Sequence, residues 1–500
     1  MHDKRAKRHE VIGALEEAGG VRPGVAREVM QATGIPEAEV YGVGTFYELL
    51  KQPAVPRVCT GTSCALRGAG ELLARARADG EAVAYSCLGQ CDRAPAMLDA
   101  SLEVVATVPR GPVTPDDPEL VVNLGGADDA SYAALARAEA LGADAVLAEV
   151  KSAGLQGRGG AGFPAHIKWA GVRSAAARDG AGAPCLVVNA DEAEPGTFKD
   201  REVMLRRPHR LLEGMAIAAE AVGATDVWIY IRGEFQACRR SMAAALAEAE
   251  LPLDVRLVEG HGAYICGEET ALLESIEGRR GMPRLKPPYP TDRGLFGRPT
   301  LIHNVETLAC VPSIVARGGD WFRAQGRTDA GSKLYCVSGH VLRPGVYELP
   351  TGVTLDELVQ VAGGYDGQPK AFSPGGASSG FLPMDYRDTP LDFRALADAG
   401  SMLGSAGVVV LNDTVDMARA ARWGQQFFED ETCGQCAPCR IGCSVQKQAI
   451  ERYLSDRNAE HLVNVDDVHE VMVEGSICGL GMTASMPLQS ARRHFPDDFR

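Results

Sequence analysis

Two groups of cysteines are the clearest candidates for chemistry in this sequence. In the stretch ETCGQCAPCRIGC, Cys433, Cys436 and Cys439 are each separated by two residues, which is the spacing that holds three corners of a [4Fe–4S] cluster. A structural zinc site pairs two separate C-x2-C units instead, so the third cysteine favours the cluster. The spacing alone leaves the fourth ligand open between Cys443 and Cys478, which lies in GSICGLG.

The second group consists of Cys59, Cys64, Cys87 and Cys91, on loops that follow two short expected strands, PRVCT and EAVAYSC. Two cysteine pairs on adjacent loops can hold a four-thiolate [2Fe–2S] cluster. A structural zinc ion is the alternative, and it is disfavoured because neither pair has the x2 spacing. We expect the remaining cysteines to be small buried hydrophobic residues; these are Cys185, Cys238, Cys266, Cys310, Cys336 and, unless it is a ligand, Cys443.

A glycine-rich loop, GRGGAGFPAHIKW (157–169), could hold a phosphate. Gly157 to Gly162 satisfy G-x-G-x-x-G, but a helix is expected before them, and no second strand ending in an acid follows as the dinucleotide fingerprint requires. The loop is not a P-loop either, because Trp169 follows Lys168 where Ser or Thr should bind magnesium. Glycines still let the backbone approach a phosphate, and Lys168 adds a cation. A plain surface loop is the alternative.

Two acidic stretches stand where ligands commonly bind. VVNADEAEPGTFKDRE (187–202) leaves an apolar strand, and HGAYICGEETALLESIEGRRG (261–281) leads into a helix. Ligands bind beyond the strand ends of open α/β sheets, although an acid at a helix start is as readily a partner of the helix dipole. Gathered together, such carboxylates could accept hydrogen bonds from ribose or ribityl hydroxyls and would repel a 2′-phosphate. They are Asp191, Glu192, Glu194, Glu268 and Glu269.

Composition limits the class of protein. The chain has 500 residues, enough for several domains, and its 51 Lys+Arg against 66 Asp+Glu give a net charge of −15, which argues against nucleic-acid binding. No uncharged apolar run approaches the ~20 residues of a membrane-spanning helix, and the start, MHDKRAKRHE, lacks the apolar segment of a secretory signal. We therefore expect a cytoplasmic location with no direct membrane insertion. In that reducing compartment, 14 cysteines indicate metal or redox chemistry rather than disulfides.

Hydrophobic periodicity divides the chain into five segments, with RGPVTPDDPE (110–119) as an expected linker or domain edge. Strands and helices alternate in the third segment, which predicts a layered α/β domain. The expected segments are a helical region (1–50), strands around one helix (51–125), the α/β region (126–330), a β-rich region (331–412) and a helical region with the second cysteine group (413–500).

Five long motifs carry a resemblance to a known family. GRGGAGFP…KW, NADEAEPGTFKDR, GAYICGEETAL, PRLKPPYP and HNVETL, in this order, closely resemble the NADH-binding flavoprotein subunit of complex I-type dehydrogenases. The same module occurs in NAD-reducing hydrogenases and in NAD-dependent, molybdenum-containing formate dehydrogenases. The resemblance covers roughly residues 140–500. Upstream, the first cysteine group with GIPEAEVYGVGTFYELL (34–50) resembles the thioredoxin-like [2Fe–2S] subunit of these dehydrogenases, here fused to the flavoprotein.

The resemblance implies α/β and α+β folds in separate domains. These are a thioredoxin-like [2Fe–2S] domain (51–125), a Rossmann-like FMN/NAD(H) domain (126–330), a β-grasp domain like those that bind soluble ligands (331–412) and a helical [4Fe–4S] domain (413–500). We expect the β-grasp domain to be a scaffold. The resemblance also favours Cys478 over Cys443 as the fourth ligand, beside Cys433, Cys436 and Cys439.

The site residues implied by the resemblance fall into two sets, with Glu192 and Glu194 as the expected catalytic carboxylates. The FMN set is Gly157, Arg158, Gly159, Ala161, Lys168, Asn189, Asp191, Glu192, Gly267, Glu268, Asn304 and Thr307, together with His303, where the family usually has asparagine. The NAD(H) set is Phe163, Glu194, Glu269, Lys286 and Tyr289.

The implied activity is that of a diaphorase, an NAD-dependent oxidoreductase subunit. A hydride passes between NAD(H) and FMN, and single electrons pass between FMN and the iron–sulfur clusters. The fusion and the compact length indicate a cytoplasmic NAD-dependent formate dehydrogenase as host, with a large molybdopterin and iron–sulfur catalytic subunit and a small [2Fe–2S] subunit as partners. A respiratory NADH:quinone oxidoreductase and an NAD-reducing hydrogenase are the alternative hosts. A flavin-free electron-transfer or assembly subunit and a zinc-bearing binding module are rivals of other classes.

Overall fold

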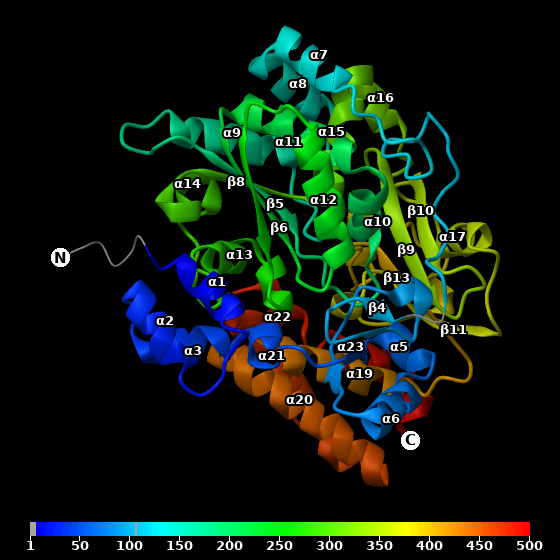
Figure 1. The fold of residues 1–500 in the computed structure, drawn as a ribbon. Helices are drawn as coiled ribbons and strands as arrows, with labels where there is room; N and C mark the ends of the chain where they lie inside the picture. Colours follow the sequence, from blue (N-terminus) through cyan, green and yellow to red (C-terminus); the bar gives the residue numbers. More distant parts are fainter. Residues whose placement is uncertain (1–6, 106–107) are drawn as a thin grey trace.

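The computed structural model describes residues 7–105 and 108–500, which contain three β-sheets with helices packed around them (Figure 1). The sheets are formed by residues 57–105, 185–304 and 332–412. In this described part, none of the helices combines the length and the apolar character needed to cross a membrane.

The N-terminal region begins with four short helices whose apolar faces are buried. Val11, Leu15, Val29 and Val40 pack into one core with residues of the α/β domain and of the C-terminal helices. The periodicity that predicted these helices is therefore the periodicity of a packed face. The helices are α1 (Glu10–Glu17), α2 (Val25–Thr33), α3 (Glu37–Gly44) and α4 (Glu48–Lys51).

The first sheet has the strand order β2-β1-β3-β4, in which β1 is parallel to β2 and antiparallel to β3. Cys59 ends β1, and the loop after β2 carries Cys87 and Cys91. Two cysteine loops therefore leave neighbouring parallel strands in the same direction. The elements are β1 (Arg57–Cys59), α5 (Thr62–Leu66), α6 (Ala69–Asp79), β2 (Val83–Tyr85), β3 (Met97–Leu98) and β4 (Val104–Val105).

The central sheet is entirely parallel, with the order β7-β6-β5-β8. Successive side chains of a strand point to opposite faces: Leu186 and Val188 join one core, and Cys185 and Val187 join another. Both faces are buried along β5 and most of β6, which explains the apolar runs of these two strands in the sequence. The strands are β5 (Cys185–Ala190), β6 (Asp226–Ile231), β7 (Asp254–Glu259) and β8 (Thr300–Asn304).

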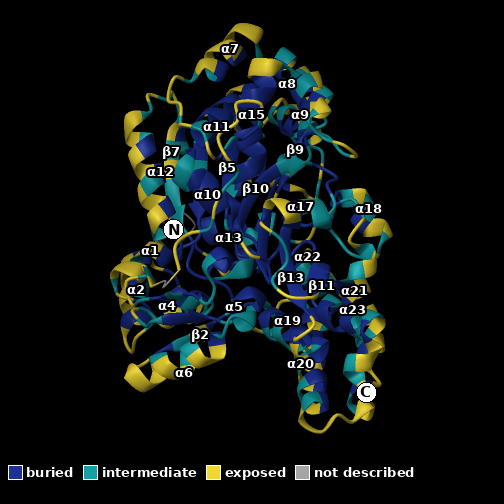
Figure 2. Cartoon of the chain, turned by 90° about the vertical axis from the view of Figure 1, so that its right-hand side faces the viewer, coloured by how far each residue is buried: buried dark blue, intermediate teal, exposed yellow. Residues whose placement is uncertain are grey.

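Helices cover both faces of this sheet (Figure 1). Figure 2 shows the buried residues gathered around β5 and the helices beside it, and exposed residues along α6 and α7. The helices of this domain are α7 (Ala133–Leu141), α8 (Ala143–Ala153), α9 (Ala165–Ala176), α10 (Lys199–Arg206), α11 (Pro208–Val222), α12 (Gln236–Glu248), α13 (Glu269–Ile276), α14 (Pro290–Arg293), α15 (Val305–Arg317) and α16 (Gly319–Ala324).

The third sheet, with the order β10-β9-β13-β11-β12, also binds the segment expected as a linker. Val113 forms a bridge to Val346 of β10, and the Val346 N–H donates to the carbonyl of Pro112 over 3.0 Å. Because β10 is an edge strand with unpaired backbone groups, it accepts this segment as a partner. The elements are β9 (Ser332–Gly339), β10 (Gly345–Pro350), α17 (Leu355–Val361), β11 (Pro369–Ser373), β12 (Leu382–Pro383), α18 (Phe393–Asp398) and β13 (Gly407–Asn412).

The C-terminal region is helical, as predicted, and its first helix packs beside the N-terminal α5. Cys433 and Cys436 lie on the loop between the first two helices, Cys439 lies in the second, and Cys478 directly precedes the fourth. The helices are α19 (Met417–Glu431), α20 (Ala437–Asp456), α21 (Val465–Gly475), α22 (Gly479–Thr483) and α23 (Met486–His494).

A buried ion pair joins the first sheet domain to the central one. The guanidinium of Arg201, in α10, donates two hydrogen bonds to the carboxylate of Asp92, at 3.0 and 2.8 Å, and both side chains are only 2% exposed. Arg201 also donates to the carbonyl of Gly89 and to the side chain of Gln90. The loop that carries Cys87 and Cys91 is therefore fixed to the central domain by a charge with no access to water.

Candidate functional site

The glycine-rich loop connects α8 to α9, so it follows a helix, as predicted, and not a strand. The N–H of Gly157 donates to the carbonyl of Phe163 over 2.9 Å and closes the loop. A Cβ atom added at Gly159 would come within 3.0 Å of the Cβ of Asn304, and Gly160 has φ +147°. The loop thus needs glycine both for its backbone conformation and for its approach to the end of β8.

Arg158 is fully buried beneath this loop. Its backbone N–H donates to Thr307 Oγ1 over 2.8 Å, and its Nη2 donates to the carbonyl of Ala330 over 2.8 Å. Its Nε and Nη1 atoms find no acceptor among the residues that the structure describes. Buried charged donors normally have partners, so two free donors beside a glycine-rich loop fit an anionic ligand such as a phosphate.

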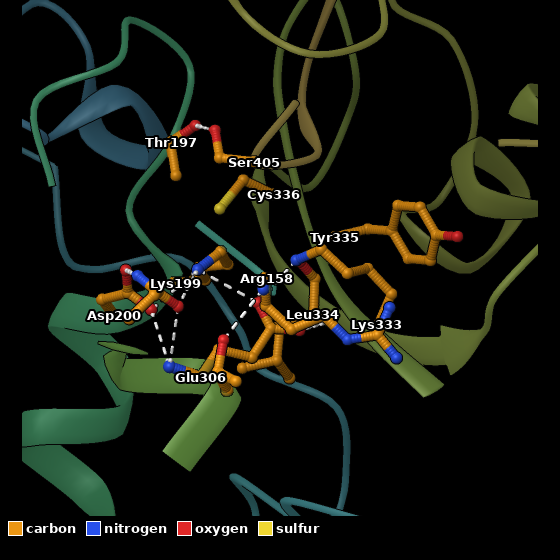
Figure 3. A network of polar contacts seen from close by, with 12 residues as sticks. Arg158, Thr197, Lys199, Asp200, Glu306, Lys333, Leu334, Tyr335, Cys336 and Ser405 are labelled. Atoms are coloured by element: carbon orange, nitrogen blue, oxygen red, sulfur yellow. Dashed lines mark hydrogen bonds and ion pairs between the residues drawn. The ribbon is translucent and has the colours of Figure 1, made fainter. Parts of the chain in front are cut away.

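A network of buried charges adjoins Arg158 (Figure 3). Lys199 lies 2.7 Å from Asp200 and 3.0 Å from Glu306, and Lys333 lies 2.5 Å from Glu306. Together with Arg158, the network has three cations and two carboxylates, all nearly free of solvent. It therefore has a surplus of one positive charge, which a bound phosphate would neutralise.

Polar residues meet where β5 and β8 end, as expected for an open α/β sheet. Asn189 and Asn304 are opposite each other in the strand register. Asn189 Nδ2 donates to the carbonyl of Gly267 over 2.8 Å, and the carbonyl of Asp191 faces the same glycine. Burial raises the pKa of the Asp191 carboxyl well above its usual range, and its Oδ2 has no donor within the described residues. This carboxyl is available to a ligand hydroxyl.

Four charged side chains form a chain along the partly exposed edge of the site, which we call its mouth. Lys168 Nζ lies 2.8 Å from Glu269 Oε2, and Lys286 Nζ lies 3.3 Å from Glu269 Oε1 and 2.7 Å from Glu268 Oε1. Glu268 is also the N-cap of α13 and accepts from the N–H groups of Thr270 and Ala271. The capping role expected as an alternative for this acid is therefore present, and its other oxygen still faces Lys286.

Glu192 accepts hydrogen bonds from the first turn of α10. Its two carboxylate oxygens accept from the N–H groups of Asp200, at 2.8 Å, and Arg201, at 3.0 Å, in the first turn of α10. Burial raises the pKa of Glu192 to about 7. The main contribution of this side chain to the folded chain is thus to position α10 and, through it, Arg201.

Glu194 is held by two residues that the sequence did not single out. Tyr264 donates its hydroxyl to Glu194 Oε2 over 2.5 Å. Ser378 donates its N–H to Oε1 over 2.9 Å and its hydroxyl to Oε2 over 3.0 Å. Tyr264 could have been found, since it lies in the motif GAYICGEETAL. Ser378 could not, because it belongs to a glycine- and serine-rich turn of the β-grasp domain, which reaches the site only in the folded chain.

The protonation of Glu194 should make stability depend on pH. Burial raises the pKa of this carboxyl from 4.5 to about 7, against the hydrogen bonds from Tyr264 and Ser378, which lower it. The folded chain therefore binds this proton more tightly than the unfolded chain, so its contribution to stability is complete below pH 4.5 and is lost as the pH rises through 7. We expect Glu194→Gln to flatten the fall in the urea midpoint between pH 5.5 and pH 8. Equal pH slopes for the two proteins would contradict this prediction.

The other expected site residues lie around the same loops. His303, nearly buried, accepts a hydrogen bond from Trp169 Nε1 over 2.8 Å, and burial lowers its pKa to about 3, so its ring is neutral. Ala161 and the aromatic rings of Phe163 and Tyr289 are exposed. Exposed aromatic faces at the mouth of a polar site are suited to stacking on a base.

The four N-terminal cysteines are buried and adjacent. Cys59 interacts with the thiols of Cys64 and Cys87, and Cys87 also interacts with Cys91. Hydrogen bonding among the thiols lowers the pKa of Cys87 well below its usual range and raises the pKa of Cys59 and of Cys91. Gly89 donates its N–H to Cys87 Sγ at 3.4 Å. Four adjacent buried thiols and a backbone N–H directed at one sulfur fit an iron–sulfur cluster.

The C-terminal cysteines differ in their solvent exposure. Cys433, Cys436 and Cys478 are partly exposed, whereas Cys439 and Cys443 are buried. Cys443 lies one turn further along α20, with its Sγ 3.8 Å from that of Cys439. Across residues 7–105 and 108–500, no three histidine, cysteine or acidic side chains converge closely enough to hold a single metal ion. The other six cysteines, Cys443 included, are buried, as expected for small hydrophobic residues.

Comparison with known protein families accounts for all four folded parts. Residues 150–313 match the Nuo51 FMN-binding domain, and residues 419–500 match the NADH-ubiquinone oxidoreductase-F iron-sulfur binding region. Residues 334–382 match the SLBB domain, and residues 2–104 match the thioredoxin-like [2Fe-2S] ferredoxin. The fold and the site therefore define an FMN-binding α/β protein flanked by two iron–sulfur domains.

Similar proteins narrow this class to a family. The chain is 45% identical over 374 residues to an F-type NADH-quinone oxidoreductase subunit of Rhizobium meliloti (strain 1021), covering 71% of this chain and 88% of that protein. It is 44% identical over 385 residues to the corresponding subunit of Mycobacterium bovis, covering 74% and 86%. The chain belongs to the family of F-type NADH-quinone oxidoreductase subunits. It is an NADH-binding flavoprotein subunit that transfers electrons through FMN and iron–sulfur clusters, and the expected cofactors are confirmed.

A solved structure extends the similarity over the whole chain. A chain of an NAD+-reducing [NiFe]-hydrogenase superposes with a TM-score of 0.89 at 30% identity, covering 99% of this chain and 93% of that one. The thioredoxin-like, FMN-binding and SLBB domains and the C-terminal helices all confirm the expected fold class.

Proposed function

We propose that this chain is a diaphorase that oxidises NADH or reduces NAD+ at a single site. The observation that carries the proposal is Arg158, buried beneath a glycine-rich loop with two donors that find no acceptor in the described chain. A flavin phosphate is the anion that fits this place beside strand ends rich in hydroxyl-binding side chains. Asp200 and Glu306 already balance the charges of Lys199 and Lys333, so the unbalanced positive charge there is that of Arg158.

The proposed division of the site follows its geometry. The residues around the loop and the ends of β5 and β8 bind FMN: Gly157, Arg158, Gly159, Ala161, Lys168, Asn189, Asp191, Glu192, Gly267, Glu268, His303, Asn304 and Thr307. The residues at the mouth bind NAD(H): Phe163, Glu194, Glu269, Lys286 and Tyr289. When bound, FMN exchanges a hydride with NAD(H) and single electrons with the clusters. Within this scheme Glu194 orients the nicotinamide, and Glu192 acts through the helix it holds.

The proposed cluster ligands follow the cysteine groups. Cys59, Cys64, Cys87 and Cys91 hold the [2Fe–2S] cluster, and Cys433, Cys436, Cys439 and Cys478 hold the [4Fe–4S] cluster. The burial of the first set excludes water from the N-terminal sulfurs, whereas the partial exposure of Cys433, Cys436 and Cys478 leaves the second site near the surface. An electron carrier near the surface can pass electrons to another subunit.

NADH should reduce artificial electron acceptors through this chain, and NADPH should be a much poorer donor. Lys168 and Lys286 are already paired with Glu268 and Glu269, so neither lysine is free to bind the extra 2′-phosphate. The measurement is dye reduction by the purified, FMN-loaded chain with each nucleotide, together with bleaching of its yellow-brown spectrum. Equal rates with NADH and NADPH would contradict the proposed selectivity. Absence of NADH-dependent bleaching would favour a flavin-free electron-transfer subunit.

For the host, we propose a cytoplasmic NAD-dependent formate dehydrogenase, which converts formate and NAD+ to CO2 and NADH. The fused N-terminal domain favours it over respiratory complexes, whose similar subunits match only 71% and 74% of this chain. A large molybdopterin subunit and a small [2Fe–2S] subunit would be the partners. An NAD-reducing hydrogenase is the second candidate, favoured by the end-to-end similarity to the hydrogenase chain.

Purification of the intact complex separates these hosts. The formate proposal expects molybdenum in the co-purified complex and formate-dependent reduction of NAD+. Nickel with hydrogen-dependent reduction of NAD+ would identify the hydrogenase, and co-purified membrane quinone-reductase subunits would identify a respiratory complex. Either result would overturn the formate proposal while leaving the diaphorase intact.

A further inference from the structure

Glu431 links three parts of the chain that are far apart in sequence. Its Oε1 accepts a hydrogen bond from the hydroxyl of Ser86, 345 residues earlier. Its Oε2 accepts from the backbone N–H of Tyr264 over 2.9 Å. Glu431 itself is the last residue of α19, directly before the first C-terminal cysteine loop. One carboxylate thus joins the N-terminal domain, the central domain and the C-terminal helices.

Each partner of Glu431 stands beside a different redox site. Ser86 is the residue before Cys87. The hydroxyl of Tyr264 holds Glu194, and its ring packs edge-on against Phe427 of α19, with the ring centroids 4.9 Å apart. The residue after Glu431 is Thr432, whose Oγ1 lies 3.1 Å from Cys439 Sγ. A displacement of Glu431 would therefore shift residues at both cysteine sites and, through Tyr264, beside Glu194.

The local structure of α19 does not explain this residue. A carboxylate at the end of a helix faces the negative end of the helix dipole, where a cation is preferred. The neighbouring acid Asp430 is exposed and makes only a local hydrogen bond with Gln426, over 2.7 Å. Glu431 differs in having two tertiary donors, so its position is determined by contacts between domains.

We propose that Glu431 is a positioning residue that fixes the two cysteine loops relative to the flavin side of the chain. Its carboxylate holds the loop of Cys87 and Cys91 through Ser86, and it holds the segment of the NAD(H) side through Tyr264. Its own backbone leads directly into the loop of Cys433 and Cys436. The proposal rests on the diaphorase function proposed above. The two electrons of a hydride leave the flavin one at a time for the clusters, and these transfers depend on the distances that Glu431 sets. Hydride transfer does not depend on them.

The test compares Glu431→Ala, Glu431→Gln, Ser86→Ala and the control Asp430→Asn in the full-length chain with its cofactors. In Glu431→Ala, bleaching of the flavin by NADH should slow much less than cluster reduction, because Ser378 still holds Glu194. The reduced-cluster signals, followed by freeze-quench electron paramagnetic resonance, should appear about tenfold more slowly, as small misplacements can cost that much or more. Amide hydrogen exchange should become faster in residues 86–91 and 432–436.

The other variants separate the contributions. Glutamine can accept from Tyr264 through its oxygen and donate to Ser86 through its amide, so Glu431→Gln should restore most of the wild-type rate. Ser86→Ala removes only the hydrogen bond to the N-terminal domain, so only the reduction of the N-terminal cluster should be slowed. This variant also tests the proposal if Glu431→Ala fails to fold. Asp430→Asn should match the wild type.

The outcomes are distinguishable from failure of the proposed function. If NADH does not bleach the wild-type flavin, the diaphorase proposal fails, and the hydrogen-exchange comparison still tests Glu431. If the wild type is bleached but Glu431→Ala and Ser86→Ala reduce their clusters as fast as the wild type, the positioning role is refuted. An equal slowing in Asp430→Asn would also refute it, because the effect would then belong to the helix end in general.

Discussion

Replacing Cys478 by serine abolishes the electron paramagnetic resonance signal of the reduced [4Fe–4S] cluster; this is the largest spectroscopic effect that we expect. Cys478 is partly exposed and directly precedes α22, and the next turn brings Gly481 so close to Cys439 that an added Cβ would lie 2.9 Å from the Cys439 Cβ. The backbone N–H groups of Leu480 and Gly481 also point at its sulfur. This approach brings a fourth thiolate to the three-cysteine loop, and a cubane cluster needs four.

Cys443→Ser is the matched control and should leave that signal nearly intact. Cys443 lies inside α20, fully buried, in the same hydrophobic core as Met472 and Phe428. Its Sγ is 3.8 Å from that of Cys439, so loss of the sulfur should affect packing more than ligation. Loss of the signal in the Cys443 variant, with retention in the Cys478 variant, would assign the fourth ligand to Cys443.

Asp92→Asn should give the largest loss of stability. The carboxylate and Arg201 are both 2% exposed, and the substitution leaves a buried guanidinium facing a neutral amide. Breaking a buried pair in this way costs about 3–5 kcal/mol, and the remaining contact of Arg201 with Glu202, at 3.0 Å, favours the lower end of that range. We expect the first unfolding transition in urea to shift to a lower concentration, with earlier proteolytic release of the N-terminal domain.

An exposed ion pair between the same two domains provides the control. Arg240 of α12 lies 2.6 Å from Glu103, with side chains 59% and 48% exposed. Exposed pairs contribute about 0–1 kcal/mol, so Glu103→Gln should leave the transition almost unchanged. If both substitutions shift the transition equally, the buried pair is not what holds the domains together.

Much of the fold could be predicted because local pattern and tertiary environment agree. The strands β5 and β6 read as uninterrupted apolar runs because both faces of their sheet are buried. β11 and β12 were not predicted: one begins with proline and the other has only two residues, so neither gives a periodic signal. The segment 110–119 has the composition of a linker, and only the exposed edge of β10 gives it a paired structure.

The candidate site could be predicted where residues act through their own chemistry. Glycine loops, cysteine spacing and acids after strands can be read from the sequence, and the structure brings most of these residues to one edge of the central sheet. Ser378 and Ser86 could not be found, because a serine in a loop has no distinguishing pattern until another domain supplies its partner. The fully buried Lys199 was missed for a related reason, since a lysine in a polar motif reads as exposed.

The bond between Ser86 and Glu431 also has a consequence for synthesis of the chain on the ribosome. Ser86 and Glu431 are separated by 345 positions. At a synthesis rate of about 5–20 residues per second, Ser86 is therefore synthesised roughly 20 to 70 s before Glu431. During that interval the N-terminal cysteine loop exists without its C-terminal contact. Loading of that site can therefore precede closure of the finished chain, which would then enclose a cluster already in place.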